Sequence, residues 1–385
     1  MVKEIESKKE LYREYSKEGS ATTLYIGGGT PSVLAPHQLE KIMSALQKNL
    51  GLSEIREFTI EVNPDDITPD YARFLHDMGI NRVSMGVQSF NDRVLEWMNR
   101  RHTAKIATEA FETLRRTGFN NISLDLIFGY AMLSEEMWRY NLENITALSP
   151  EHISAYQMSI ESGSTLSAME KRGEYTPPSQ ERCAAEYSML QEILSKKGYA
   201  QYEVSNFCKR SGEDTLSKVL PYEEGLKYRS IHNSSYWNNV PYIGFAPGAH
   251  SYSGIYTNEN GNPEAKREWN THKINRYISY YTRAELTKEA KSTGDRVGNG
   301  AGYKAGYEIL ERRELFNEVI MLGLRQTKGC KEEHLKAIGE HYYREIESTL
   351  SQLIGTGMLI KENGYIKIPS EKLFVSDGII RDLFV

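Results

Sequence analysis

The segment Thr23-Leu24-Tyr25-Ile26-Gly27-Gly28-Gly29-Thr30-Pro31-Ser32 joins an apolar run to a glycine-rich turn near the start of this 385-residue chain. Glycines at the end of a strand let a ligand approach the backbone where any Cβ atom would clash. The exposed N–H and C=O groups of such a turn can hold an amino-acid-like group. By itself the signal is weak, since many glycine-rich β-to-α turns bind no ligand, so its meaning depends on the segments that follow.

The first 210 residues alternate between strand and helix patterns. Repeated βα units with apolar strands predict a parallel α/β sheet, arranged either as a barrel or as a doubly wound sheet. Both arrangements place their binding sites at the carboxyl ends of the strands. We expect strands at Thr23–Ile26, Phe58–Val62, Arg82–Val87, Asn121–Phe128 and His152–Ser159. We expect helices at Pro36–Leu50, Thr68–Met78, Asp92–Asn99, Ala104–Thr117, Glu135–Leu148 and Ser179–Lys197.

A different pattern begins beyond residue 294 and divides the chain into three parts. Residues 1–294 form the expected barrel, residues 295–310 a glycine-rich linker, and residues 311–385 a winged-helix-like α+β domain. This domain carries 11 Lys and Arg against 12 Asp and Glu, whereas a DNA-binding wing would be basic, so we expect a packing or lid domain. Its helices are expected at Glu311–Leu324, Lys331–His341 and Tyr343–Gly355, its hairpin strands at Met358–Lys361 and Gly364–Ile368, and a surface loop earlier at Ser211–Ser230.

Composition and charge exclude several classes of protein. The net charge of −5 argues against a large non-specific nucleic-acid surface. No apolar stretch approaches the roughly 18 residues that span a bilayer, and the N-terminus is charged from Lys3 onward, unlike a signal peptide. The three cysteines, Cys183, Cys208 and Cys330, match neither a zinc motif nor a redox CxxC pair. Sparse, isolated thiols are typical of a reducing compartment, so we expect a cytoplasmic protein.

Four polar residues follow the glycine-rich turn along the expected strands. Glu61 lies at the end of one strand, Gln88 at the end of the next and Asp125 within the third, while Arg100 follows the helix between them. Each has a structural alternative when taken singly, as a loop carboxylate, a helix-terminal cation or a satisfied polar residue of a strand. Because they occur on successive strands, they favour a binding site together with the turn.

The series GGGTPS, EVNPDD, SMGVQSFNDRVLEWMNRRH and NISLDLIFG, from residues 27, 61, 84 and 121, resembles one family of proteins. It is similar to the radical S-adenosylmethionine proteins of the oxygen-independent coproporphyrinogen III oxidase superfamily, over essentially the whole chain. The resemblance implies a partial (βα)6 barrel that holds S-adenosylmethionine at its C-terminal face. It also implies that Gly28, Gly29 and Thr30 contact the methionine amino group, and that Glu61, Gln88, Arg100 and Asp125 line the ribose and carboxylate region.

The motif His232-Asn233-Ser234-Ser235-Tyr236-Trp237 resembles the HNxxYW motif of the HemW-type haem chaperones within that superfamily. An imidazole can ligate haem iron, and Tyr236 and Trp237 offer flat apolar faces to a porphyrin. The structural alternative is a loop histidine beside core aromatic residues. A second candidate ligand, His250, lies in a glycine-rich turn, where a structural role is favoured. The segments YEVSNF, YIGFAPGAHSY and REWN, from residues 202, 242 and 267, extend the likeness.

The N-terminus departs from the pattern of the superfamily. Its members begin with a strand and a CxxxCxxC loop whose thiolates hold three irons of a [4Fe–4S] cluster. This sequence starts at the helix after that loop, so we expect a barrel that lacks its first strand and its cluster cysteines. None of Cys183, Cys208 or Cys330 can substitute at the required spacing. Residues 23–26 would then form an unpaired sheet edge.

The resemblance implies three alternatives for function. The favoured one is a haem chaperone, leaning away from an enzyme, that binds haem and transfers it to an acceptor protein. The second is an oxygen-independent coproporphyrinogen III dehydrogenase, a radical oxidoreductase of porphyrin biosynthesis. The third is an N-terminally truncated, inactive form of either. The implied cofactors are S-adenosylmethionine and haem, with [4Fe–4S] expected for the family, and the partners are haem and its acceptor, without nucleic acid and with membrane contact only through the acceptor.

Overall fold

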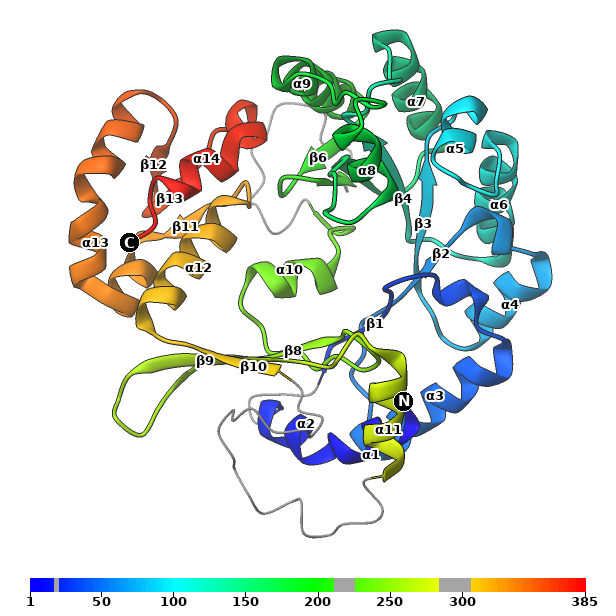
Figure 1. Ribbon diagram of the computed structural model, residues 1–385, viewed down its shortest axis with the longest axis horizontal. Coiled ribbons are helices and arrows are strands. Elements are labelled where there is room, and N and C mark those ends of the chain that lie inside the picture. The colour runs from blue at the N-terminus through cyan, green and yellow to red at the C-terminus, as the bar shows by residue number, and fades with distance from the viewer. Residues whose placement is uncertain (17–20, 211–225, 284–305) are drawn as a thin grey trace.

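The computed structural model describes residues 1–16, 21–210, 226–283 and 306–385. A curved sheet with its helices forms one side of the molecule, and a smaller C-terminal domain forms the other (Figure 1). The helix α10, Ile231–Trp237, lies between the two (Figure 1). Most of the predicted loop Ser211–Ser230 and almost all of the predicted linker Asp295–Gly306 lie outside the described residues.

The main sheet has seven strands in the order β1-β2-β3-β4-β5-β7-β6. The first five are parallel to one another, while β7 runs antiparallel to both β5 and β6. Within the described residues β1 pairs with β2 alone, so it forms the predicted sheet edge. The partial barrel is confirmed, and the five predicted strands lie within two residues of the observed ones. The strands are β1 (Thr23–Ile26), β2 (Glu57–Val62), β3 (Arg82–Gln88), β4 (Ile122–Phe128), β5 (His152–Gln157), β6 (Tyr199–Gln201) and β7 (Asn206–Lys209).

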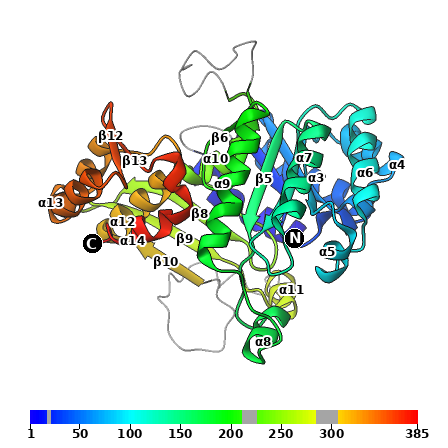
Figure 2. The same cartoon turned by 90° about the horizontal axis from the view of Figure 1, so that it is seen from above.

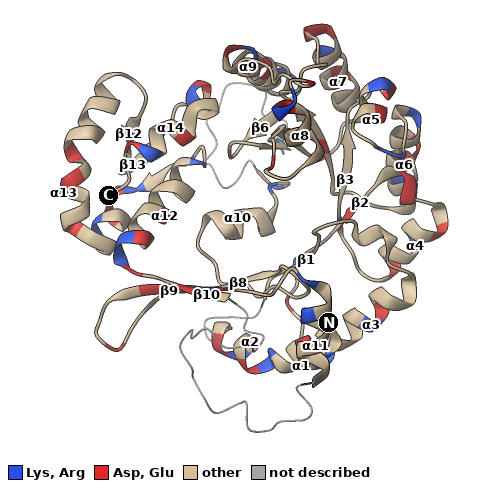
Figure 3. Cartoon of the chain, viewed as in Figure 1, with Lys and Arg blue, Asp and Glu red and all other residues tan. Residues whose placement is uncertain are grey.

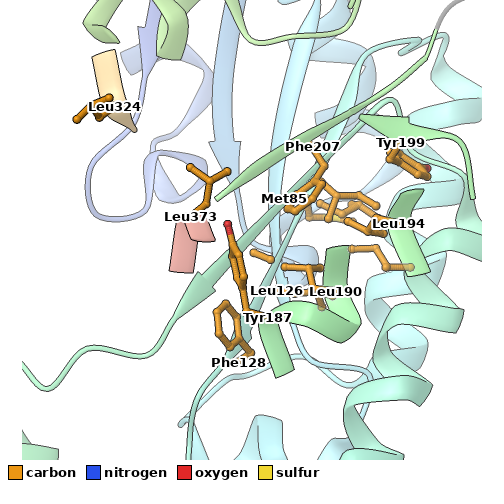
Figure 4. Packing of buried hydrophobic residues seen from close by; sticks show 14 of the residues in the cluster. Met85, Leu126, Phe128, Tyr187, Leu190, Leu194, Tyr199, Phe207, Leu324 and Leu373 are labelled. Atoms are coloured by element: carbon orange, nitrogen blue, oxygen red, sulfur yellow. The ribbon is translucent and has the colours of Figure 1, made fainter. Parts of the chain in front are cut away.

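Helices between the strands form an outer arc around the sheet (Figure 1) and cover its apolar face (Figure 2). Alternate residues of the strands, such as Ile60, Val83 and Leu124, are fully buried beneath them. Leu190 of α9 packs in the same cluster (Figure 4). Because successive side chains of a strand point to opposite faces, the residues between these apolar ones face the barrel interior. The helices are α3 (Pro36–Leu50), α4 (Pro69–Asp77), α5 (Asp92–Trp97), α6 (Ala104–Thr117), α7 (Glu135–Leu148), α8 (Thr165–Lys171) and α9 (Gln180–Lys196).

A second, antiparallel sheet of three strands was not predicted from the sequence. Its order is β10-β9-β8, with β8 at His250–Thr257, β9 at Pro263–Trp269 and β10 at Gly306–Leu310. The prediction of a linker over residues 295–310 is therefore wrong for its last five residues, since these pair with β9. Beside this sheet lie the N-terminal helices and α11, which are α1 (Val2–Ser7), α2 (Lys9–Tyr15) and α11 (Ile274–Arg283).

The C-terminal domain combines helices with a small sheet of order β11-β13-β12, in agreement with the predicted α+β pattern. The two helices predicted between Lys331 and Gly355 are one helix, α13, which is kinked at Gly339. A Cβ atom at Gly339 would lie 2.7 Å from the ring of Tyr342, so glycine permits the kink there. The elements are α12 (Arg312–Leu324), β11 (Cys330–Lys331), α13 (Glu332–Gly355), β12 (Ile360–Glu362), β13 (Tyr365–Lys367) and α14 (Ser376–Arg381).

A short seam of backbone hydrogen bonds joins the barrel to the C-terminal domain. The N–H of Val204 donates to the carbonyl of Arg325 at 3.1 Å, and the N–H of Thr327 donates to the carbonyl of Tyr202 at 3.1 Å. Between them, Gln326 donates from its side chain to the carbonyl of Trp237 at 3.2 Å. The seam therefore fixes the end of α10 as well as the two domains.

Candidate functional site

The glycine-rich turn lies tightly against the end of β2. A Cβ atom at Gly27 would overlap the ring of Tyr25 and lie 2.8 Å from the carboxyl group of Glu61. Gly28 and Gly29 have φ values of +82° and +78°, in the left-handed region that favours glycine, and nothing lies within 4 Å of a Cβ atom placed on either. The turn therefore has one face closed by side chains and a backbone that is open to a ligand.

Glu61 connects this turn to strand β1. Its Oε1 atom accepts a hydrogen bond from the Tyr25 hydroxyl at 2.7 Å, and its Oε2 atom accepts one from the N–H of Gly28 at 3.0 Å. The carboxylate is only partly buried. Each oxygen keeps a further lone pair, so Glu61 can accept hydrogen bonds from a ligand without losing either contact.

Arg100 and Gln88 meet at the end of β3. The Nη2 atom of Arg100 donates to the Oδ1 atom of Asn63 at 2.9 Å and to the carbonyl of Gly86 at 3.1 Å. Gln88 has φ +66° and follows an irregularity in the register between β3 and β4. Within the described part of the chain Arg100 forms no ion pair, so its guanidinium remains available for a carboxylate.

Asp125 lies in the middle of β4, deeper in the barrel than a strand-end position. It is paired in register with Gly86, and its carboxylate accepts a hydrogen bond from the Ser84 hydroxyl at 3.3 Å. Burial raises the pKa of Asp125 to about 6, and the negative charge of Glu61 adds to the shift, while Ser154 and Arg82 oppose it. The structure therefore places Glu61, Gln88 and Arg100 near the carboxyl ends of the strands, beside the glycine-rich turn, with Asp125 deeper in the barrel but close enough to interact with the charges of Glu61 and Arg100.

This set of groups fits S-adenosylmethionine. The open turn backbone, an unpaired guanidinium and two carboxylates complement an amino acid joined to a ribose. The residues do not fit a [4Fe–4S] cluster. The cysteines Cys183, Cys208 and Cys330 are each buried, and the described residues contain no group of three or more His, Cys, Asp or Glu that could hold a metal ion.

Helix α10 begins on the interior of the barrel, where Glu57 holds its first residues. The carboxylate of Glu57 is 3% exposed and accepts hydrogen bonds from the N–H groups of Ile231 and His232, both at 2.8 Å. It also accepts from the Ser230 hydroxyl at 3.2 Å. A carboxylate at the first turn satisfies N–H groups that have no partner within the helix. Glu57 therefore fixes the position of the His232 backbone, from which the side chain extends.

The imidazole of His232 is held on three sides. Its Nδ1 atom lies 3.0 Å from the Thr23 hydroxyl, and its Nε2 atom lies 3.1 Å from the Tyr236 hydroxyl. Its ring stacks on Tyr25, with centroids 4.6 Å apart and an angle of 18° between the planes. Burial, together with the nearby positive charge of Arg82, lowers the pKa of His232 to about 4. The imidazole is therefore neutral near pH 7, which is the form that ligates a metal.

Aromatic rings continue outward from His232. Tyr236 is 40% exposed and packs edge-on against both His232 and Tyr242, with centroid distances of 5.0 Å and 4.8 Å. Figure 3 shows that α10 carries no charged residue, whereas charges are frequent on the outer helices. A neutral imidazole among partly exposed aromatic rings fits a flat, apolar ligand with a metal centre.

Two residues that the sequence associated with His232 lie apart from it. Trp237 follows Tyr236 by one residue, about 100° around the helix, and among the described residues it makes no ring contact with His232 or Tyr236. Its carbonyl binds Gln326 of the C-terminal seam. The exposed ring of His250 stacks on Trp269, with centroids 5.8 Å apart.

Sequence reasoning missed the residues that support both sites. The sequence patterns assign no site role to Thr23, Tyr25 or Glu57, although all three face the barrel interior. A signal for them exists, because polar residues at every second position of β1 and β2 indicate that the inner face is polar. Their partners on α10 are 175 to 209 residues away in the sequence, so no local pattern could identify the contacts.

Comparison with known proteins agrees with this geometry. The sequence model of the radical SAM superfamily matches residues 2–145. The chain is 30% identical to the haem chaperone HemW of Lactococcus lactis, over 97% of this chain and 87% of that protein. It is 32% identical to the haem chaperone HemW of Bacillus subtilis, over 88% of this chain and 78% of that protein. The chain therefore belongs to the HemW family of radical SAM proteins.

A solved structure shows the same fold. Coproporphyrinogen III oxidase from Escherichia coli superposes with a TM-score of 0.70, covering 100% of this chain and 84% of that one, at 16% sequence identity. At this identity the likeness concerns the fold alone. In the part of the chain that the structure describes, no helix is both long and apolar enough to cross a membrane.

Proposed function

We propose that this protein is a haem chaperone that binds haem at the outer end of the His232 cluster and passes it to an acceptor protein. The observation that carries the proposal is the placement of the His232 imidazole, which is held by Thr23 and Tyr25 and lies next to the partly exposed Tyr236. The HemW relatives named above support the same role. The coproporphyrinogen III dehydrogenase alternative rests on similarity of fold alone.

In this proposal haem is the cargo, and three groups of residues act on it. His232 would ligate the iron through Nε2, while the rings of Tyr236 and Tyr242 would contact the porphyrin plane. The main-chain carbonyl of Trp237 holds the end of α10 to the C-terminal seam, and its indole remains a proposed contact for the porphyrin.

The second part of the proposal is an S-adenosylmethionine site at the glycine-rich turn. Gly28, Gly29 and Thr30 would hold the amino acid part through the open backbone, and Arg100 would hold its carboxylate. Glu61, Gln88 and Asp125 would contact the ribose. No step of the proposed function passes through an iron–sulfur cluster, because the cysteines present do not fit one.

A haemin titration of the purified protein tests the haem site. We expect a shifted Soret band in the wild-type protein and in His250→Ala, which removes an exposed histidine outside the cluster. His232→Ala should lose that shift, because it removes the proposed ligand. If His232→Ala gives the wild-type spectrum and affinity, the assignment of the ligand is wrong. Transfer is then tested by mixing the loaded protein with haem-free acceptor candidates and following the Soret band of each.

A further inference from the structure

The imidazole of His232 has hydrogen-bond partners at both of its nitrogen atoms. Thr23 lies at Nδ1 and Tyr236 lies at Nε2. We propose that Thr23, on the edge strand β1, is a positioning residue that accepts the Nδ1 hydrogen of His232 and so presents the Nε2 lone pair to haem iron. The inference rests on the proposed function, and it names a residue that the motif around His232 does not contain.

The chemistry of imidazole gives the first argument. A neutral imidazole has one N–H group and one lone pair, and only the nitrogen with the lone pair can ligate iron. If Nε2 is the ligand, Nδ1 must carry the hydrogen and needs an acceptor. Histidines that bind metals donate their other N–H in nearly every case, and this second contact fixes the tautomer. The hydroxyl of Thr23, 3.0 Å from Nδ1, can serve as the acceptor that this arrangement requires.

The stacking on Tyr25 does not select between the two orientations of the imidazole ring. Turning the imidazole by 180° about its χ2 bond exchanges nitrogen and carbon positions but leaves the ring in the same plane. Both orientations therefore stack equally on Tyr25. The hydroxyl of Thr23 distinguishes them, because only one orientation places Nδ1 where it can donate. Thr23 thus determines the orientation of the ring, while Tyr25 determines its plane.

The backbone makes this contact rigid. Thr23 is paired in register with Glu57 of the neighbouring strand. Glu57 in turn accepts from the N–H of His232 at 2.8 Å. The main chain and the side chain of His232 are therefore held by two adjacent residues of one sheet. A site on such strands holds its geometry better than a site on a loop.

Tyr236 completes the arrangement on the other side of the ring. It lies one helical turn after His232, and its hydroxyl is 3.1 Å from Nε2. When Thr23 accepts the Nδ1 hydrogen, the Tyr236 hydroxyl donates to the Nε2 lone pair. Because Tyr236 is 40% exposed, its side chain can turn toward solvent when iron takes that position. The Nε2 lone pair therefore points toward the partly exposed Tyr236.

Three variants test the proposal on the full chain. Thr23→Val has nearly the same shape but no acceptor, Thr23→Ser keeps the hydroxyl, and Thr22→Val makes the same change at the residue before the strand. Haemin titrations should show about 10-fold weaker binding for Thr23→Val, with Thr23→Ser and Thr22→Val close to wild type. Thermal unfolding of each variant checks that the fold is retained.

A measurement without haem provides a second readout. Nitrogen NMR of the histidine-labelled protein distinguishes the two tautomers, and we expect His232 to carry its hydrogen on Nδ1 in the wild type and in Thr23→Ser. In Thr23→Val the Nδ1 population should fall. Wild-type affinity and an unchanged tautomer in Thr23→Val would overturn the inference, as would equal losses in Thr23→Val and Thr23→Ser. If His232→Ala loses the Soret shift while Thr23→Val is normal, this inference alone fails, and the proposed function stands.

Discussion

The two sites that meet on strand β1 are built in different ways. At its carboxyl end, the glycine-rich turn contacts Glu61, a residue 33 to 36 positions away, and leaves its backbone open. At the start of the strand, Thr23 contacts His232 from 209 positions away, and the nitrogen atoms of that histidine already have partners. The turn is ready to accept a ligand, whereas the His232 cluster must exchange one of its own contacts. Tyr25 belongs to both sites, because its hydroxyl binds Glu61 and its ring stacks on His232. Changes that reach Tyr25 should therefore affect both sites, and changes that do not reach it should affect only one, which the following variants examine.

The largest expected effect concerns Glu203, a 2% exposed carboxyl in the seam that holds α10. Burial raises its pKa to about 7 from an ordinary value of 4.5, although the N–H of Ser205 opposes the shift. Between these values the folded protein binds more protons than the unfolded chain, so the free energy of unfolding falls as pH rises through this window. The loss should reach about 3 kcal/mol by pH 8.

Urea unfolding of the wild type and of Glu203→Gln, at pH 5 and pH 8, measures this effect. The amide keeps an acceptor for Ser205 but has no charge, so the variant should lose less stability over the same range. Equal pH dependence in both proteins would show that Glu203 does not titrate in this window. Binding of S-adenosylmethionine should change little, because the seam does not contact the glycine-rich turn.

The next variant, Gly27→Ala, breaks the turn and, through the ring of Tyr25, should also disturb the stacking of His232. The added Cβ atom overlaps Tyr25 and Glu61, which should cost about 2 kcal/mol of stability and weaken the binding of S-adenosylmethionine. Calorimetric titration with S-adenosylmethionine measures the binding. Gly355→Ala is the matched control, because neither glycine has a positive φ, and a Cβ atom on Gly355, at the end of α13 outside the site, meets nothing within 4 Å. An equal loss of binding in the control would refute the assignment.

Glu57→Gln weakens the support of α10 and should leave the glycine-rich turn intact. The charged carboxylate accepts from two N–H groups of α10, and its neutralisation should cost about 1.5 kcal/mol. Haem affinity should fall because His232 is held less firmly, while binding at the glycine-rich turn stays unchanged. Parallel titrations with haemin and with S-adenosylmethionine measure the two affinities. A drop in both affinities would mean that the two sites are not independent.

The smallest effect is expected from Tyr236→Phe. This variant keeps the ring but removes the hydroxyl at Nε2, so iron no longer displaces a hydrogen bond worth about 1 kcal/mol. Haem should therefore bind about fivefold more tightly. Haemin titration against wild type measures the change, with Tyr242→Phe as a control that removes a hydroxyl from the same aromatic group. Weaker binding in Tyr236→Phe would show that the hydroxyl assists the bound state.

Most of the barrel could be predicted from the sequence, because its apolar strands and amphipathic helices repeat a local pattern. The failures occur where tertiary contacts override such patterns. Strand β9, Pro263–Trp269, is rich in charged residues and shows no apolar alternation, yet it is stabilised by β8 and β10 on either side. The break between the two predicted C-terminal helices is the kink of α13 at Gly339, about three residues before the predicted position, and this error is local because Tyr342, whose ring approaches Gly339, lies on the same helix.

The family motifs, the order of the βα units and the predicted residues of both sites can be identified from the sequence alone. These properties depend on periodicity and on chemical identity, which are local. The contacts of Thr23 and Tyr25 with His232, and the attachment of the end of α10 to the C-terminal seam, emerge only in the folded chain. The reason is that strand β1 and helix α10 meet through the curvature of the sheet and the carboxylate of Glu57, and neither depends on sequence neighbours.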